Sequence, residues 1–204
     1  LGVYPGRFSL WRRLLLLASP LVPTEGMNEH GLTVSKAYVP RDDPPYDPSR
    51  DTLMFRTAMR LVLDQARTTQ EAIDLLALYN ISFAGAGGHL LIADPSGDSA
   101  ILEYFDDQVV VIRNPAPWQV ITNFEVGNPN NQDQEPGCQR YNLVEDALEH
   151  SEGVLNIEGG LDLLSQVSVN GTLWSISFDM TTQEMDIVLH RQYENVFHLS
   201  KDGW

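Results

Sequence analysis

The sequence predicts an α+β fold, in which helices and mainly antiparallel strands occupy separate blocks of the chain. Apolar residues recur at helical spacing between residues 51 and 79. Short apolar runs separated by turn residues then fill residues 89–122, and apolar and polar residues alternate over residues 174–189. We therefore expect helices packed on stacked sheets, with residues 1–204 forming one domain.

The N-terminal segment contains two arginines and then a short apolar run at residues 14–17, an order that is also found in secretory signal peptides. The run is too short to span a bilayer, so we expect no membrane partner. We interpret the segment as a buried strand leading into the block GMNEHGL at residues 26–32. Within that block we expect Asn28 to be a structural turn residue and Gly31 to adopt a conformation that other residues resist.

Two amphipathic helices are predicted next. The first covers residues 51–66, where four apolar residues lie on one face: Phe55, Met59, Val62 and Ala66. Thr68 and Glu71 then form a capping-box pattern in front of a second periodic run over residues 72–79. We expect both helices to pack as one layer, and we assign them no chemistry.

The middle block is predicted to hold four strands, at residues 89–93, 100–104, 109–112 and 118–122. The sequence Asp-Pro-Ser-Gly at residues 94–97 is typical of a tight turn, so the first two strands should form a hairpin. The unbroken run VVVI at residues 109–112 predicts a strand that is covered on both faces.

The last third of the chain is predicted to contain a helix over residues 139–150 and a shorter helix over residues 161–167. A closing hairpin follows. Its strands alternate apolar and polar residues on either side of the turn Thr181-Thr182-Gln183.

Composition and motifs exclude several functions. With 28 acidic against 13 basic residues and a net charge of −15, the chain lacks the clustered Lys and Arg that nucleic-acid binding needs. No Gly-rich phosphate loop is present, the five His residues are scattered, and Cys138 is the one Cys, so we expect no cofactor and no metal. Arg140 beside Cys138 could lower the pKa of its thiol, but a single Cys is more often an inert apolar filler.

The order of five segments is more specific: GMNEHGL, LLIADPSGDSAILEY, WQVITNF, a Cys-x-Arg-Tyr helix start, and TLWSISFD. From about Glu25 onward, this order resembles the choloylglycine hydrolase and penicillin V acylase family, the linear amide C–N hydrolases of the N-terminal nucleophile superfamily. The resemblance implies a four-layer αββα fold, complete or incomplete at its N-terminus. It also implies hydrolysis of a small-molecule linear amide by an N-terminal Cys, whose own amino group acts as base.

The resemblance assigns roles to three residues. Asn123 matches the family's Asn that donates a hydrogen bond to the oxyanion, although taken alone it is typical of a turn. Arg140 matches an Arg near the nucleophile, where it favours a thiolate or binds a carboxylate; an exposed helix-start arginine is the alternative. Tyr38 falls where penicillin V acylases have Tyr and bile salt hydrolases have Asn, which indicates an apolar or aromatic acyl pocket unless Tyr38 is only a half-buried filler.

One departure leaves the activity open. Family members carry the nucleophilic Cys in a strand well upstream of the GMNE block, whereas no Cys, Ser or Thr begins this chain. The chain could be a processed fragment, a relative without the catalytic strand, or one piece of an enzyme completed by another polypeptide. We expect either a homo-oligomer or a complementing N-terminal segment to cover the exposed sheet edge. The alternative function is a catalytically inactive acyl-ligand binding module or partial subunit.

Overall fold

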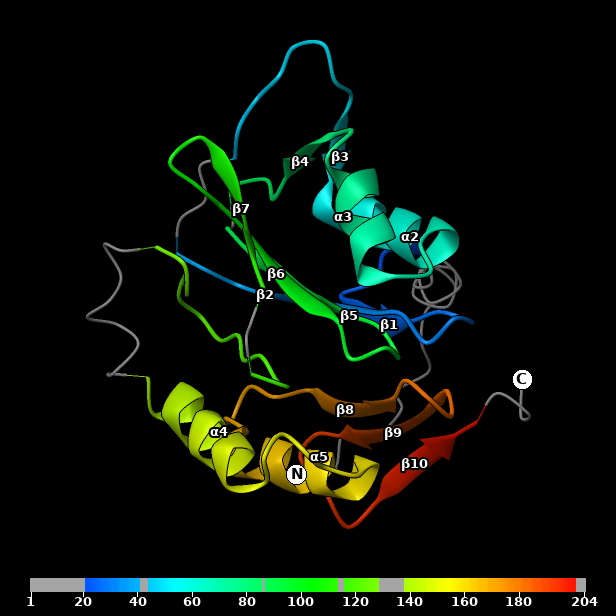
Figure 1. The fold of residues 1–204 in the computed structure, drawn as a ribbon. Helices are drawn as coiled ribbons and strands as arrows, with labels where there is room; N and C mark the ends of the chain where they lie inside the picture. Colours follow the sequence, from blue (N-terminus) through cyan, green and yellow to red (C-terminus); the bar gives the residue numbers. More distant parts are fainter. Residues whose placement is uncertain (1–20, 41–43, 86, 114–115, 129–137, 201–204) are drawn as a thin grey trace, which may run out of the picture.

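The computed structural model describes residues 21–40, 44–85, 87–113, 116–128 and 138–200. Helices α2 (Phe55–Gln65) and α3 (Thr69–Leu76) cover one face of a five-stranded sheet, and a three-stranded sheet lies beyond its other face (Figure 1). Helix α5 (Ile157–Val167) packs on the far side of that second sheet, and helix α4 (Gln139–His150) lies beside α5, next to the sheet. Helices and strands are thus separated into layers, and the predicted α+β class is confirmed.

The five-stranded sheet has the order β1-β2-β5-β6-β7, with all neighbours antiparallel. Its strands are β1 (Glu25–Met27), β2 (Thr33–Ala37), β5 (His89–Ala93), β6 (Ser99–Phe105) and β7 (Gln108–Ile112). The predicted hairpin of β5 and β6 is confirmed: the Gly97 amide donates to the Asp94 carbonyl at 3.0 Å and closes the turn.

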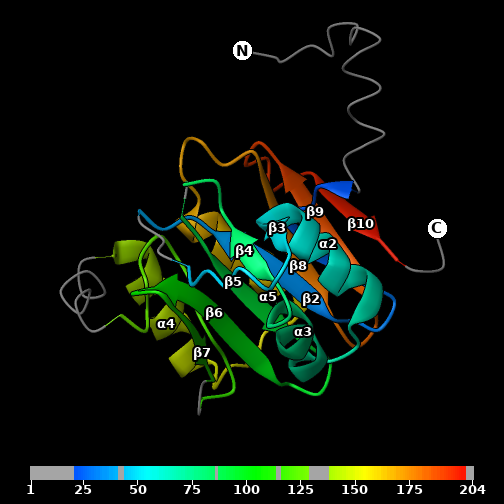
Figure 2. The ribbon, with the colours of Figure 1, turned by 90° about the horizontal axis from the view of Figure 1, so that it is seen from above.

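The three-stranded sheet has the order β10-β9-β8, and its β8 (Trp174–Asp179) and β9 (Glu184–Leu189) are the predicted closing hairpin. Strand β10 (Val196–Leu199) was not predicted. Two short strands, β3 (Thr52–Met54) and β4 (Asn80–Ser82), pair in parallel, and Figure 2 shows them with α2 and α3 over the five-stranded sheet. Among the described residues, β8 pairs with β9 alone, so its other edge carries no strand.

The two faces of the five-stranded sheet differ because successive side chains of a strand point to opposite sides. On the helix side, four buried residues of β5 and β6 pack against buried residues of α2: Leu90, Ile92, Leu102, Tyr104, Ala58, Met59 and Val62. The alternate residues of the same strands, such as Leu91 and Glu103, point toward the three-stranded sheet. One sheet therefore supplies both an apolar core and one wall of the cleft between the sheets.

The helical pair forms largely as predicted. The Thr68 hydroxyl accepts from the Glu71 amide, as the capping-box pattern predicts, but the Glu71 carboxylate accepts from the amide of Arg67, one residue before the N-cap. The first helix begins at Phe55 rather than at residue 51, since residues 52–54 pair with β4 instead. The second helix ends at Leu76, before the predicted limit at residue 79.

Two predicted features of the middle block are wrong. Residues 118–122 do not form a strand. The backbone of this segment and of the residues after it pairs with side chains instead of a neighbouring strand: the Thr122 carbonyl with His89 and the Val126 amide with Glu103. The VVVI run is not covered on both faces, because β7 is an edge strand whose Val109 and Val111 are 46% and 40% exposed. The strand predicted before residue 25 lies mostly outside the described residues, and Glu25–Met27 forms β1.

The turn after β1 fastens the two sheets together, and the structural interpretation of Asn28 and Gly31 is confirmed. The Asn28 amide nitrogen donates to the Ala66 carbonyl at 2.7 Å, near the end of α2. Gly31 has a φ of +76°, and a Cβ there would collide with the Met180 carbonyl oxygen. Thr33 and Gln183 add contacts between the sheets, to the Met180 sulfur and the Glu29 carbonyl respectively.

Candidate functional site

A cleft of about 850 Å³ opens between the two sheets and the helices beneath them. Strands β2 and β5, the segment 119–123, helices α4 and α5, and strand β8 line it, through residues that include Ser35, Tyr38, Leu91, Asn123, Arg140, Leu164, Trp174 and Ile176. A smaller cavity of about 340 Å³ shares Leu91, Leu164 and Ile176 with it and extends toward Met180. The inter-sheet space is therefore one continuous groove along β8.

The three residues that the resemblance singled out lie together at this cleft. The Asn123 amide nitrogen donates to the Tyr38 carbonyl at 2.8 Å, and an Arg140 terminal nitrogen donates to the Asn123 amide oxygen at 2.6 Å. Tyr38 and Asn123 are 85 positions apart in the sequence. The fold thus brings together residues from β2's end, the 119–123 segment and the start of α4.

These contacts fix the orientation of the Asn123 amide. Because the guanidinium of Arg140 is a donor only, it must face the amide oxygen, which directs the amide nitrogen away from it. The nitrogen carries two hydrogens, and Tyr38 accepts one of them. No other described residue accepts from this nitrogen, and Asn123 lines the cleft, so a carbonyl oxygen or an oxyanion could accept the second hydrogen there.

A fully buried pair, His89 and Glu103, holds the backbone on which Asn123 lies. His89 Nε2 donates to the Thr122 carbonyl at 2.9 Å, and its Nδ1 is 2.9 Å from Glu103 Oε1. Glu103 also accepts from the Val126 and Gly127 amides, at 2.7 and 2.8 Å. These bonds clamp the chain on both sides of Asn123, in place of a strand ladder.

The acceptors around His89 fix where its protons lie. The Thr122 carbonyl has no hydrogen to give, so Nε2 must carry one. Nδ1 and Oε1 are 2.9 Å apart, so one hydrogen must lie between them for that contact to be attractive. A fully buried hydrogen bond of this kind holds both side chains in place, since removing either partner leaves the other unsatisfied.

Cys138 lies behind the cleft rather than in it. Its thiol is 3.5 Å from the Thr122 hydroxyl, and it packs with the small cluster of Val120, Phe124 and Tyr141. Burial opposes ionisation, but the Thr122 hydroxyl, the Tyr141 and Arg140 amides and the Arg140 charge together lower the pKa of Cys138. The thiol is not among the described residues that line the cleft, so we assign Cys138 a packing role.

The described residues contain no group of three or more His, Cys, Asp or Glu arranged to hold a metal ion. Among the same residues, no helix is both long and apolar enough to cross a bilayer.

His89 and Glu103 were not singled out from the sequence, although a signal for them exists. Both residues lie on the strands of the predicted hairpin, at 89–93 and 100–104, and the observed register, in which Leu90 lies opposite Leu102, places His89 opposite Glu103. A His opposite a Glu in two otherwise apolar strands predicts a buried polar pair. The acceptor at Thr122 could not be found in this way, because its position depends on tertiary packing.

Comparison with known proteins identifies relatives. A family model described as acyl-coenzyme A:6-aminopenicillanic acid acyl-transferase matches residues 19–194. No curated protein matches the chain. Penicillin V acylase from Agrobacterium tumefaciens is similar in structure, with a TM-score of 0.68 and 22% identity over 90% of this chain and 67% of that one.

Two variants of conjugated bile acid hydrolase from Clostridium perfringens are also similar. Their TM-scores are 0.66 and 0.65, with 13% and 14% identity, over 89% of this chain and 73% of theirs. At such identity, these likenesses concern the fold alone.

Proposed function

The chain belongs to the acyl-coenzyme A:6-aminopenicillanic acid acyl-transferase family, and we propose that its inter-sheet cleft binds a linear amide for hydrolysis of the C–N bond. The expected activity is of the penicillin V acylase or bile salt hydrolase type, on the αββα fold of N-terminal nucleophile hydrolases. The observation that carries the proposal is the Asn123 amide, held by Arg140 and Tyr38 with one N–H free at the cleft.

The proposed chemistry uses that N–H as an oxyanion donor. A thiol sulfur forms a bond to the amide carbon, and the carbonyl oxygen becomes an oxyanion that accepts from Asn123. The C–N bond then breaks as the thiol's proton passes to the leaving amine. Water next attacks the thioester, the S–C bond breaks, and a proton returns to the sulfur. Transfer of the acyl group to an amine instead of water would share the first half of this sequence.

The thiol must reach the cleft from outside the described residues. We place it on an extended, complementing N-terminal segment along the free edge of β8, because Trp174, Ile176 and Phe178 of that strand line the groove. Backbone pairing at such an edge would hold the segment beside Asn123. A homo-oligomer is the other arrangement that would cover this edge.

Tyr38 and Arg140 would contribute to recognition. Tyr38 would contribute by holding Asn123 with its carbonyl, while its ring lies 5.7 Å from the Lys36 ammonium, which also lies over Phe55 and Phe83 of the helix-side core. Arg140 keeps further N–H groups beyond the one given to Asn123, so it could bind a carboxylate of the leaving group.

A second function is favoured by the absence of a thiol among the described residues that line the cleft. Without a nucleophile, the same donors would hold an acyl ligand without turning it over. The chain would then be a binding module or a partial subunit on the same scaffold.

One experiment separates the two functions. The chain is titrated calorimetrically with penicillin V and with a glycine-conjugated bile acid, while released amine is measured in parallel. Release that falls on the order of 100-fold with Asn123→Ala, but not with the remote control Asn195→Ala, supports the hydrolase. Binding without release supports the module.

Two other outcomes would count against the site. Release that survives Asn123→Ala but is lost with Cys138→Ala would place the chemistry at Cys138. Neither binding nor release, for either compound, would contradict both functions.

A further inference from the structure

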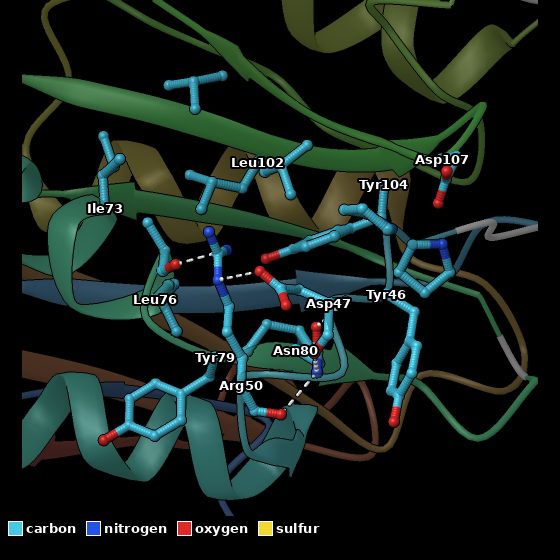
Figure 3. A pocket seen from close by; sticks show the side chains of 16 residues that line it. Tyr46, Asp47, Arg50, Ile73, Leu76, Tyr79, Asn80, Leu102, Tyr104 and Asp107 are labelled. Carbon is cyan, nitrogen blue, oxygen red and sulfur yellow. Dashed lines mark hydrogen bonds and ion pairs between the residues drawn. The ribbon is translucent and has the colours of Figure 1, made fainter.

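A second cavity, of about 430 Å³, lies on the opposite face of the five-stranded sheet from the cleft. The loop 44–50, α3, β4, β6 and β7 line it, and Figure 3 shows these side chains at close range. Its walls are apolar, with Ile73, Leu76, Leu102, Val109 and Val111 among them. A cavity of this size is in the range of small-molecule sites.

Tyr104 contributes a buried polar group to this cavity. Tyr104 is only 3% exposed, and its ring packs edge-on against Phe83 at 5.2 Å between centroids. Burial raises the pKa of Tyr104, so its hydroxyl stays protonated and can donate. No described residue hydrogen-bonds to that hydroxyl, and Figure 3 shows it directed toward Arg50. The hydroxyl oxygen is not among the fully enclosed polar atoms that lack a partner, so it is open to the cavity, where a ligand acceptor could accept from it.

Arg50 supplies a second donor. One terminal nitrogen donates to the Ala77 carbonyl at 2.8 Å, and Nε lies 3.3 Å from the Asp47 carboxylate. The other terminal nitrogen makes no contact with the described residues. Asn80 holds this loop in place, donating to the Asp47 and Arg50 carbonyls and accepting from the Asp47 amide. The donor is therefore positioned before any ligand binds.

The charges around the cavity favour a neutral ligand. Hydrogen bonds from the Ser49 hydroxyl and amide lower the pKa of Asp47, so its carboxylate is ionised and offsets the charge of Arg50. Asp107 adds a further negative charge to the lining. A carboxylate ligand would meet this acidic rim, and an ammonium would meet Arg50, whereas a neutral acceptor meets neither penalty.

We propose that this pocket binds a neutral, largely apolar carbonyl compound, an amide or ester with an aryl or branched alkyl body. Its carbonyl oxygen accepts from the Tyr104 hydroxyl and from the unoccupied Arg50 nitrogen, and its body packs against α3, β6 and β7. This site is separate from the cleft and does not depend on the proposed hydrolase function.

Four matched probes test the proposal by calorimetry or ligand-observed NMR on the intact chain: N-methyl-2-phenylacetamide, phenylacetate, phenethylamine and propylbenzene. We expect the neutral amide to bind most tightly. Tyr104→Phe should weaken its binding roughly fivefold, because it removes one neutral hydrogen bond and keeps the ring. Tyr79→Phe is the matched control, since Tyr79 lines the same pocket but points away from Tyr104 and Arg50 in Figure 3.

A second variant fills the pocket without touching the donors. Val111 is half-exposed at the pocket wall, so Val111→Phe should abolish binding while the chain stays folded. If binding is unchanged in both Tyr104→Phe and Val111→Phe, or is lost in Asn123→Ala, the ligand does not bind in this pocket. Tighter binding of phenylacetate than of the amide would overturn the ligand class, and no binding of the amide at millimolar concentration would overturn both.

Discussion

The two faces of the five-stranded sheet are formed by the same strands, but their buried side chains do different things. On the helix face, Leu102 and its neighbours form an apolar core, in which Tyr104 carries a polar group. On the cleft face, the adjacent residue Glu103 is equally buried, yet it binds His89 and two backbone amides. The difference teaches that the helix face holds the fold together, while the cleft face uses a buried pair of hydrogen-bonded side chains to place one segment of irregular backbone.

The largest expected effect comes from breaking the cleft-face pair. Glu103→Ala should destabilise the chain by about 3–5 kcal/mol, because it leaves His89 buried and two amides unpaired. It should also weaken ligand binding at the cleft, since the Asn123 backbone loses its clamp. Urea unfolding and calorimetry measure the two effects. The control is His198→Asn, which removes a half-exposed ion pair with Asp186 and should cost under about 1 kcal/mol.

Leu102→Ala tests the other face at the neighbouring position. It should destabilise by about 2–4 kcal/mol, because it opens a void in the core. Cleft binding, measured per folded molecule, should not change. If Leu102→Ala weakened cleft binding as much as Glu103→Ala does, the assignment of separate roles to the two faces would be wrong.

Asp94 links the β5–β6 turn to the start of α3, and its effect should depend on pH. Burial alone would raise the pKa of Asp94, but hydrogen bonds from the Ser96 hydroxyl and from the Thr69 and Ser96 amides outweigh it and lower the pKa. A carboxylate whose pKa is lower in the folded than in the unfolded chain stabilises the fold at any pH above its unfolded pKa, which is near 3.9 for Asp. This stabilisation is lost as the pH falls through the folded pKa.

Asp94→Asn should therefore lower the free energy of unfolding by about 2 kcal/mol at pH 7. The difference in unfolding free energy between the variant and the parent chain should become smaller toward pH 3. Unfolding by urea across that pH range measures it. A gap that stays constant with pH would show that the charge of Asp94 contributes nothing to folding.

The smallest expected effect on stability is at Arg140. Because the Arg140–Asn123 contact is exposed, Arg140→Ala should change the unfolding free energy by under about 0.5 kcal/mol. Cleft binding should nevertheless weaken about tenfold, since the Asn123 amide then keeps only its contact with the Tyr38 carbonyl and is held less firmly. Arg140→Gln, which can still donate to the amide oxygen, should recover part of that loss. If Arg140→Ala binds the cleft ligand as tightly as the parent chain does, then this guanidinium does not orient Asn123.

Local signals explain what could be predicted from the sequence. The helix over residues 139–150 and the turn at 94–97 depend on periodicity and turn chemistry, and both agree with the structure. The proximity of Tyr38, Asn123 and Arg140 came from the family resemblance, because no local pattern joins residues so far apart. The strand predicted at 118–122 was wrong for the same reason, since the bonds of His89 and Glu103 depend on tertiary packing.

The fastening at Gly31 has a mechanical consequence for the groove. Gly31, Thr33 and Met180 join the two sheets at one end of β2, whereas Tyr38 and Asn123 lie past its other end. Trp174, the first residue of β8, also donates to the Glu25 carboxylate of β1, so a second contact joins the sheets at the other end of β8. A ligand of the proposed site would therefore have to fit a groove whose walls are held at two places, because neither wall can move away from the other at these contacts.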